Sequence, residues 1–176
     1  NRFSTMNFPE GVASEINIFI KNIADFYYSL RAENEDYNEL SSYVVASPSD
    51  FGFHNILSLE STLYFIDFEY AGKDSIWKLI CDFFAQPEKL VELRYFKEIS
   101  ACVPWSIVCQ NQVSLLYAFQ LTLLKWSLII LNTQIRLAHG EKDEERVKSL
   151  LFGLNKAEAY FKNITQRSNE LKNILN

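Results

Sequence analysis

The alternation of apolar and polar residues sets a short extended region apart from the rest of the chain. Two apolar runs, Ile56–Leu59 and Leu63–Ile66, lie on either side of the polar triplet Glu60-Ser61-Thr62. Runs of this length around a short polar turn predict a β-hairpin. A third apolar run, Tyr43–Ala46, leads into the loop that precedes the hairpin. This region organises the interpretation of the whole chain.

The longer segments on both sides show the spacing of amphipathic helices. Ser14 is the expected cap of a first helix from Glu15 to about Arg31, after an irregular start at residues 1–13 and before a polar loop at residues 32–42. Its expected apolar side consists of Ile16, Ile18, Phe19, Ile23, Phe26 and Tyr27. Further helices are expected from a cap at Asp74 or Ser75 to about Ala85, from Pro87 to about Ile99, from Gln112 to His139 with Gly140 as the stop, and from Glu141 to about Leu171.

Together these patterns predict an α+β protein that is mostly helical, with residues 1–176 as a single domain. Hydrophobic residues make up 48% of the chain, which is enough to bury a core and excludes a disordered protein. The aromatic residues Trp77, Tyr117 and Trp126 fit core packing at helical spacing, and the alternative is that they line a pocket for a substrate.

Three residues with oxygen-bearing side chains lie at the ends of the predicted hairpin. Asp50 and Asn55 are in the loop before it, and Asp67 follows its second strand directly. Strand pairing brings such positions together. Magnesium prefers oxygen ligands and takes only a few of them from the protein, so Asn55 and Asp67 suit a metal site. Asp50 is then the candidate base for an attacking hydroxyl. The alternative for Asp50 and Asn55 is an ordinary role as turn residues.

This segment resembles the aminoglycoside phosphotransferase and choline kinase family, whose catalytic loop usually reads H-G-D-x-x-x-x-N, followed by a hairpin and I-D-[FW]-E. The chain has Asp50, Asn55 and Ile66-Asp67-Phe68-Glu69 at the corresponding positions. The resemblance covers about residues 40 to 90. It implies a protein-kinase-like carboxy-terminal lobe in which Asp50 is the catalytic base, Asn55 and Asp67 bind Mg²⁺, and ATP is the phosphoryl donor.

Asp50-Phe51-Gly52 also spells the metal-binding tripeptide of protein kinases. That assignment requires an Asp-x4-Asn pair upstream, and the residue five positions after Asp36 is Ser41. We therefore assign the metal motif to Asp67-Phe68-Glu69. Glu69 is either a second group near the metal or the acceptor substrate, or a solvated residue at the end of a strand.

The chain departs from the family pattern at two positions. Pro48 replaces the family histidine two residues before the base, so hydrogen bonds to the catalytic loop must come from elsewhere. The family often has an aspartate near Lys78, and the nearest acids here are Asp74 and Asp82. His54 is expected to pack or cap the loop and not to bind the metal.

A kinase also needs a glycine-rich loop over the phosphates and a strand lysine that contacts them. The five glycines form no G-x-G-x-x-G sequence, so we expect the nucleotide-binding amino-terminal lobe to be missing from this chain or supplied elsewhere. The sequence therefore predicts an ATP-dependent phosphotransferase for a small-molecule hydroxyl (amino sugar, sugar or amino alcohol), with the isolated chain inactive. The alternative is a non-catalytic kinase-like binding module.

Charge and cysteine content bear on partners and location. The formal net charge of −5 argues against a nucleic-acid binder. The long apolar segment around Val113–Leu131 contains Gln120 and Lys125, which favours a buried helix over a membrane span. Cys81, Cys102 and Cys109 form no C-x2-C pair, and we expect them to be reduced and buried in a cytoplasmic protein.

Overall fold

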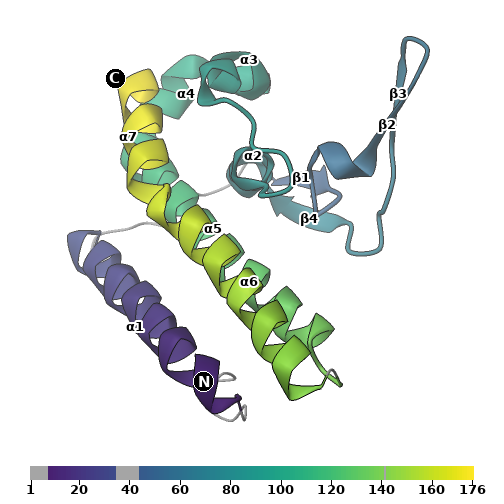
Figure 1. The fold of residues 1–176 in the computed structure, drawn as a ribbon. Coiled ribbons are helices and arrows are strands. Elements are labelled where there is room, and N and C mark those ends of the chain that lie inside the picture. The colour runs from purple at the N-terminus through teal and green to yellow at the C-terminus, as the bar shows by residue number, and fades with distance from the viewer. Residues whose placement is uncertain (1–7, 35–43, 141) are drawn as a thin grey trace. The chain divides into compact units, whose positions relative to one another are not determined.

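The computed structural model describes residues 8–34, 44–140 and 142–176, and within them the protein is α+β and mostly helical (Figure 1). This confirms the predicted class, while the identity of a kinase-like lobe stays a prediction. The elements in chain order are α1 (Glu10–Glu33), β1 (Val44–Ser47), η2 (Phe53–Asn55), β2 (Ile56–Leu59), β3 (Thr62–Phe65), β4 (Gly72–Ser75), α2 (Ile76–Ala85), η3 (Leu93–Tyr95), α3 (Phe96–Ile99), η4 (Ser100–Cys102), α4 (Trp105–Gln110), α5 (Gln112–Leu137), α6 (Asp143–Lys162) and α7 (Ile164–Leu175).

The strands form two antiparallel pairs. β2 and β3 make the predicted hairpin, in which Ile56 is paired with Phe65 and Leu59 with Thr62. β4 pairs with β1, so that Val44 lies opposite Ser75. β4 was not predicted, because Lys73 and Asp74 break any apolar alternation. Its extended form comes from pairing with β1, which is distant in the sequence.

The described residues separate into two compact units. Unit 1 contains α1, the part of α5 that begins at Ser127, and α6. Unit 2 contains both strand pairs, the helical segments from α2 to α4, the part of α5 that ends at Trp126, and α7. That the whole chain is one domain stays a prediction.

Unit 1 is built on the packing of α1 against α6. The rings of Phe19 and Phe26 each meet the ring of Phe161 edge-on, at centroid distances of 5.9 and 5.6 Å. The buried face of α1 consists of Val12, Ile16, Phe19, Ile23 and Leu30. This spacing of three, four and seven residues is that of one helix face.

Two expectations for α1 were wrong. The helix begins at Glu10 and not after Ser14, because the Pro9 carbonyl accepts hydrogen bonds from the backbone N–H groups of Val12 and Ala13. Ile18 and Tyr27, expected on the apolar side, are exposed. Ile18 is offset from the helical period of the buried face, whereas Tyr27, four residues after Ile23, lies at the edge of that face and is 37% exposed.

The core of unit 2 is α2, which is buried on nearly every side. Of the two predicted caps, Asp74 and Ser75, the N-cap is Ser75, since its hydroxyl accepts a hydrogen bond from the Trp77 N–H at 3.2 Å. The helix expected from Pro87 to Ile99 is wrong. Residues 86–92 are irregular, and only the short η3 and α3 follow. The Val91 carbonyl accepts a hydrogen bond from Arg167 instead of from a helical amide.

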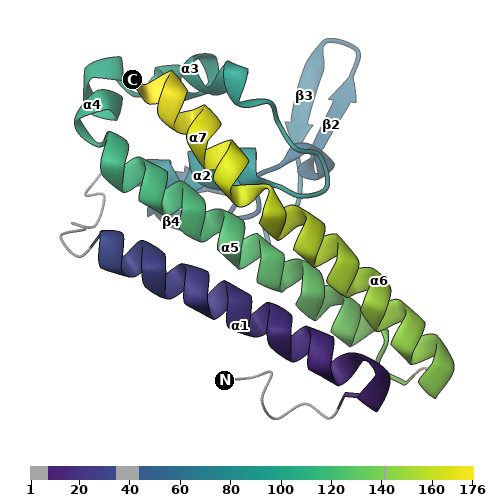
Figure 2. The ribbon, with the colours of Figure 1, turned by 60° about the vertical axis from the view of Figure 1, so that its left-hand side comes forward.

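The carboxy-terminal helices agree with the predicted ones in part. α5 ends at Leu137, and Gly140 has a φ of 94°, which suits its predicted role in stopping the helix. The last helix is divided at Asn163 into α6 and α7, and α4 was not predicted. In unit 2, the end of α7 lies beside the start of α5 (Figure 2). Val113, Leu116 and Leu175 line a small hollow between these two ends.

Among the described residues, one helix is long and apolar enough to cross a membrane, namely α5. This is weak support for a membrane span, since the core helix of a soluble protein passes the same test. Trp77 and Tyr117 are buried, as the core interpretation predicts.

The three cysteines are free thiols. Cys81 is buried, and this burial, together with the neighbouring Asp82 carboxylate, raises the pKa of its thiol. Cys81 is therefore a poor nucleophile. The expectation of buried cysteines is wrong for Cys102, the last residue of η4, which is exposed, and Cys109 is only half-buried.

Candidate active site

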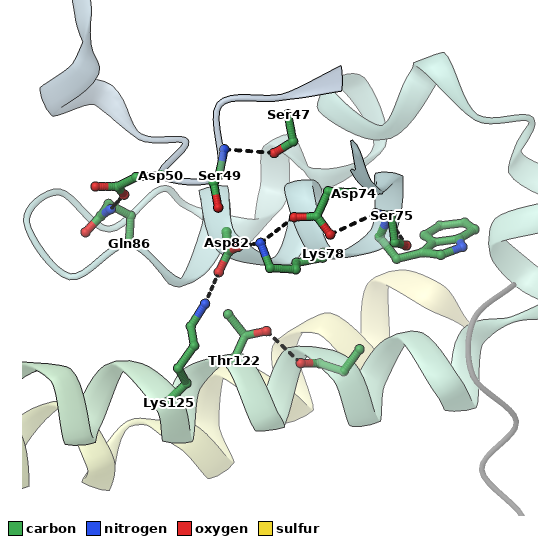
Figure 3. Close-up of polar contacts among 12 residues, drawn as sticks. Ser47, Ser49, Asp50, Asp74, Ser75, Lys78, Asp82, Gln86, Thr122 and Lys125 are labelled. Atoms are coloured by element: carbon green, nitrogen blue, oxygen red, sulfur yellow. Dashed lines mark hydrogen bonds and ion pairs between the residues drawn. The ribbon is translucent and has the colours of Figure 1, made fainter. Parts of the chain in front are cut away.

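The loop between β1 and η2 begins in a constrained conformation. Ser47, the last residue of β1, is buried, and its hydroxyl accepts a hydrogen bond from the Ser49 N–H at 3.0 Å (Figure 3). Ser49 has a φ of 69°, which is uncommon for a residue with a side chain. Such conformations cluster at functional sites. The turn at Ser49 directs the chain into Asp50.

Asn55 closes this loop from its other end. Its side-chain nitrogen donates a hydrogen bond to the backbone carbonyl of Asp50 at 3.0 Å, and its backbone N–H donates to the Gly52 carbonyl at 3.0 Å. Asn55 is buried. Because the amide nitrogen is engaged, the amide oxygen is the atom of this side chain that suits a cation. The Asp-x4-Asn spacing therefore forms one closed loop.

The hairpin brings the backbone of Asn55 close to that of Asp67. The Ile66 N–H donates a hydrogen bond to the Asn55 carbonyl at 2.9 Å, which extends the ladder beyond the Ile56–Phe65 pair. Asp67 follows directly with a φ of 60° and is exposed. The strand pairing thus places the two predicted metal ligands at the same end of one hairpin, as the sequence pattern indicated.

The carboxylate of Asp50 is held by two side chains that the motif does not contain. Gln86 donates a hydrogen bond from Nε2 to Asp50 Oδ1 at 3.1 Å (Figure 3). His54 Nε2 lies 3.2 Å from Asp50 Oδ2. His54, expected to pack or cap the loop, therefore contacts the candidate base itself. Gln86 and His54 thus hold the Asp50 carboxylate in a loop in which Pro48 stands two residues before it.

Gly52 allows the loop to approach Gln86. A Cβ atom on Gly52 would lie 2.8 Å from Gln86 Cγ and 2.9 Å from the His54 ring. Contacts this short do not occur in folded proteins, so a side chain at position 52 would displace one of the two groups that hold Asp50. The φ of Gly52 is extended at −165°, so the requirement is for space and not for conformational freedom.

The ion pairs of the buried Asp82 carboxylate and of Lys78 join three elements, namely α2, α5 and β4. Asp82 on α2 forms ion pairs with Lys78 at 2.9 Å and with Lys125 of α5 at 2.5 Å (Figure 3). Lys78 also pairs with Asp74 of β4 at 2.6 Å. Burial lowers the pKa of Lys78, but its hydrogen bonds and ion pairs with Asp74 and Asp82 outweigh this, and the pKa is raised above 10.5.

This cluster occupies the position where the family often has an aspartate near Lys78. In this chain Lys78 stands at that position, and the acids Asp74 and Asp82 lie on either side of it. Asp82 is one helical turn further along α2. Each oxygen of the buried Asp82 carboxylate therefore lies beside one lysine ammonium group, Oδ2 beside Lys78 and Oδ1 beside Lys125.

The last two residues of the predicted motif are solvent-exposed. Phe68 and Glu69 are the first two residues of a tight turn in which the Ala71 N–H donates to the Phe68 carbonyl at 3.0 Å. The exposed position of Glu69 fits both of its interpretations, as an acceptor-binding or metal-shell group and as a solvated strand end, so its role stays a prediction.

Gln86 and Lys125 were not predicted as residues of the candidate site. A signal for Gln86 existed in Pro87, because the residue before a proline is driven out of the helical conformation. Pro87 therefore indicates that α2 ends here and that Gln86 lies outside the helix. Lys125 carried no such signal, since its partner Asp82 lies 43 residues away in the chain.

Comparisons of this chain with protein-family models, with curated proteins and with solved structures found no match. The function of this chain is therefore inferred from the residues and contacts described above.

Proposed function

We propose that this chain is the catalytic lobe of an ATP-dependent phosphotransferase that acts on a hydroxyl group of a small molecule. The observation that supports this most strongly is the closed loop at the base of the hairpin. The Asn55 amide is tied to the Asp50 carbonyl, and the Asn55 carbonyl is tied to the residue before Asp67. These hydrogen bonds join the backbone at or next to all three candidate residues, and this supports the inference that the base candidate and the two oxygen ligands act together.

Asp50 has the role of general base in this proposal. Its side chain is 44% exposed, so an acceptor hydroxyl can reach it. The hydroxyl oxygen forms a bond to the γ-phosphorus of ATP, the bond from that phosphorus to the bridging oxygen breaks, and ADP leaves. The hydroxyl proton passes to the Asp50 carboxylate. Positioning and charge stabilisation, and not covalent chemistry by the protein, account for the rate of such reactions.

The donor set fits magnesium. Asn55 offers an amide oxygen and Asp67 a carboxylate, which are hard ligands of the type that Mg²⁺ accepts together with phosphate oxygens and water. When bound, Mg²⁺ neutralises charge on the phosphates. Asn55 is held rigidly by its two hydrogen bonds, whereas Asp67 is exposed and able to meet the nucleotide from the hairpin.

We propose further that a nucleotide-binding lobe outside this chain covers the hairpin. β2 and β3 extend from the loop beside α2 (Figure 1) and carry exposed apolar side chains on both faces. By the strand register, Leu57, Leu59 and Tyr64 lie on one face, and Leu63 and Phe65 on the other. A two-stranded ribbon that is apolar on both sides needs a cover for stability. A lobe that packs on the hairpin would also lie next to Asn55 and Asp67.

The first test is turnover of Asp50→Asn in the complete protein, with a panel of amino sugars, sugars and amino alcohols assayed for ATP consumption. We expect a loss of about 10²- to 10⁴-fold in kcat without loss of folding, because general-base catalysis is removed. Asp25→Asn is the matched control, since Asp25 is an exposed carboxylate of α1 that pairs with Lys21. An Asp50→Asn enzyme with near-normal kcat would contradict the proposal.

The second test separates an enzyme from a non-catalytic kinase-like module, which Pro48 favours. We expect Asp67→Asn to abolish magnesium-dependent ATP consumption, because the asparagine amide lacks the negative charge with which the carboxylate binds the metal. A wild-type protein that binds a small molecule but consumes no ATP with any acceptor would favour the module instead.

A further inference from the structure

We propose that Gln86 is a positioning residue for Asp50 and that Arg167 on α7 holds the segment that carries Gln86. This inference rests on the proposed role of Asp50 as the general base. Neither residue belongs to the catalytic motif, and both come from parts of the chain that are distant from it in sequence.

The local sequence aims Gln86 at the catalytic loop. Pro87 disfavours the helical conformation for the residue before it, and Gln86 accordingly ends α2 with φ and ψ of −61° and 119°. The residue is 2% exposed, so its amide is shielded from water. The side chain meets Asp50 Oδ1 at 3.1 Å across 36 residues of sequence. A shielded donor of this kind fixes the rotamer of its acceptor more firmly than a solvated one.

Arg167 secures the backbone on both sides of Gln86. Its Nη2 donates hydrogen bonds to the Phe84 carbonyl at 2.7 Å and to the Val91 carbonyl at 3.2 Å. Its guanidinium also lies over the Phe119 ring, 5.9 Å from the centroid. Phe84 is in the last turn of α2, where carbonyls lack helical partners, and a cation is favourable there. One side chain thus closes the irregular segment of residues 86–92 into a loop.

Orientation of the Asp50 carboxylate matters because the side chain is partly exposed and is otherwise free to rotate. With Oδ1 held by Gln86 and Oδ2 beside His54, the remaining lone pairs face a restricted set of directions. A displacement of about 1 Å in a reacting group lowers a rate about 10²-fold. The contact with Gln86 is therefore expected to affect the chemical step more than substrate binding.

The experiment compares Gln86→Met, which keeps the length of the side chain but removes the donor, with the control Gln166→Met on the exposed side of α7. We expect Gln86→Met to lower kcat about 10- to 100-fold while KM for ATP changes less than about twofold. Gln166→Met should match the wild type. The decisive readout is a double-mutant cycle in which Gln86→Met causes no further loss in the Asp50→Asn background.

Arg167→Lys provides a second variant, because it keeps the charge but loses the planar fork. We expect a smaller loss in kcat that also disappears in the Asp50→Asn background. The inference is overturned if either variant lowers activity equally with and without Asp50, since that is the pattern of a structural defect. It is also overturned if Gln86→Met retains the wild-type kcat.

The failure of this inference is distinguishable from failure of the proposed function. If the wild-type protein consumes no ATP, the proposed function fails, and crystal structures of the wild type and of Gln86→Met then test the contact alone. A carboxylate of Asp50 that turns away in the variant supports positioning by Gln86. A carboxylate that keeps its place overturns it.

Discussion

At the scale of single residues, unusual backbone conformations coincide with the candidate site. Among the described residues, three without glycine's freedom have positive φ, namely Ser49, Glu60 and Asp67. Glu60 lies in the hairpin turn, where such values are ordinary. Ser49 directly precedes the candidate base Asp50, and Asp67 is itself a candidate metal ligand. The hydrogen bond to the Ser47 hydroxyl supports the strained backbone at Ser49, and the pairing of the hairpin supports it at Asp67.

Lys78 gives a prediction for the dependence of stability on pH. Its pKa in the folded protein is raised above 10.5, because the ion pairs with Asp74 and Asp82 outweigh the effect of burial. A raised pKa means that the folded state binds the proton more tightly than the unfolded state does. The contribution to the free energy of unfolding is therefore complete below about pH 10 and is lost as pH rises through the folded pKa.

We accordingly expect Lys78→Met to flatten the decline of stability above about pH 10, as measured by urea unfolding at a series of pH values. Lys21→Met is the control, because Lys21 pairs with Asp25 at the same spacing of four residues but both side chains are exposed. An identical alkaline decline in the wild type and in Lys78→Met would show that the pairs of Lys78 do not stabilise the fold.

At the scale of elements, Gly153 determines how closely α6 approaches the second half of α5. A Cβ atom on Gly153 would lie 2.3 Å from Cβ of Gln134. Gln134 Cβ is attached to the backbone and cannot turn away, so the helices of unit 1 would have to separate. Glycine is normally unfavourable inside a helix. Here its small size permits the close packing.

We expect Gly153→Ala to destabilise the protein by about 1 to 3 kcal/mol, since overpacking outweighs the gain in helix propensity. Gly11→Ala is the opposite case, because a Cβ atom on Gly11 meets only Val147 Cγ1 at 3.9 Å. That variant should be neutral or stabilise by up to about 1 kcal/mol. Thermal or urea unfolding of both variants measures the difference, and equal effects of the two would contradict the packing argument.

At the scale of the whole molecule, the exposed hairpin bears on how the isolated chain behaves. Leu59 and Leu63 are 65% and 58% exposed, and they lie on opposite faces of the ribbon. Nothing in the sequence forms a glycine-rich phosphate loop. We therefore expect purified residues 1–176 to fold, to bind ATP far more weakly than the complete protein, and to self-associate through the hairpin.

Charge on the hairpin is the matching test. The double variant Leu59→Lys/Leu63→Lys should reduce self-association in sedimentation measurements without lowering the melting temperature, because both side chains are exposed. Tight magnesium-dependent ATP binding by the isolated wild-type chain would show that no further lobe is needed. Unchanged association of the variant would show that another surface is responsible.

Local patterns in the sequence predicted much of this structure. The hairpin, the cap at Ser75 and most of α5 follow from apolar spacing and from residues within one or two turns. The Asp50–Asn55 loop was also evident, because its hydrogen bonds join residues at most five positions apart. Such contacts depend on short-range geometry, and residue type and spacing therefore determine them.

The tertiary structure alone decided the partners of the candidate site. Gln86 meets Asp50 across 36 residues, Lys125 meets Asp82 across 43, and Arg167 meets Phe84 across 83. No periodicity encodes these pairs, because each depends on how α2, α5 and α7 pack together. The sequence by itself determined which groups could do chemistry at the base of the hairpin. The packing of distant helices decided which side chains hold the Asp50 carboxylate and the end of α2 in place.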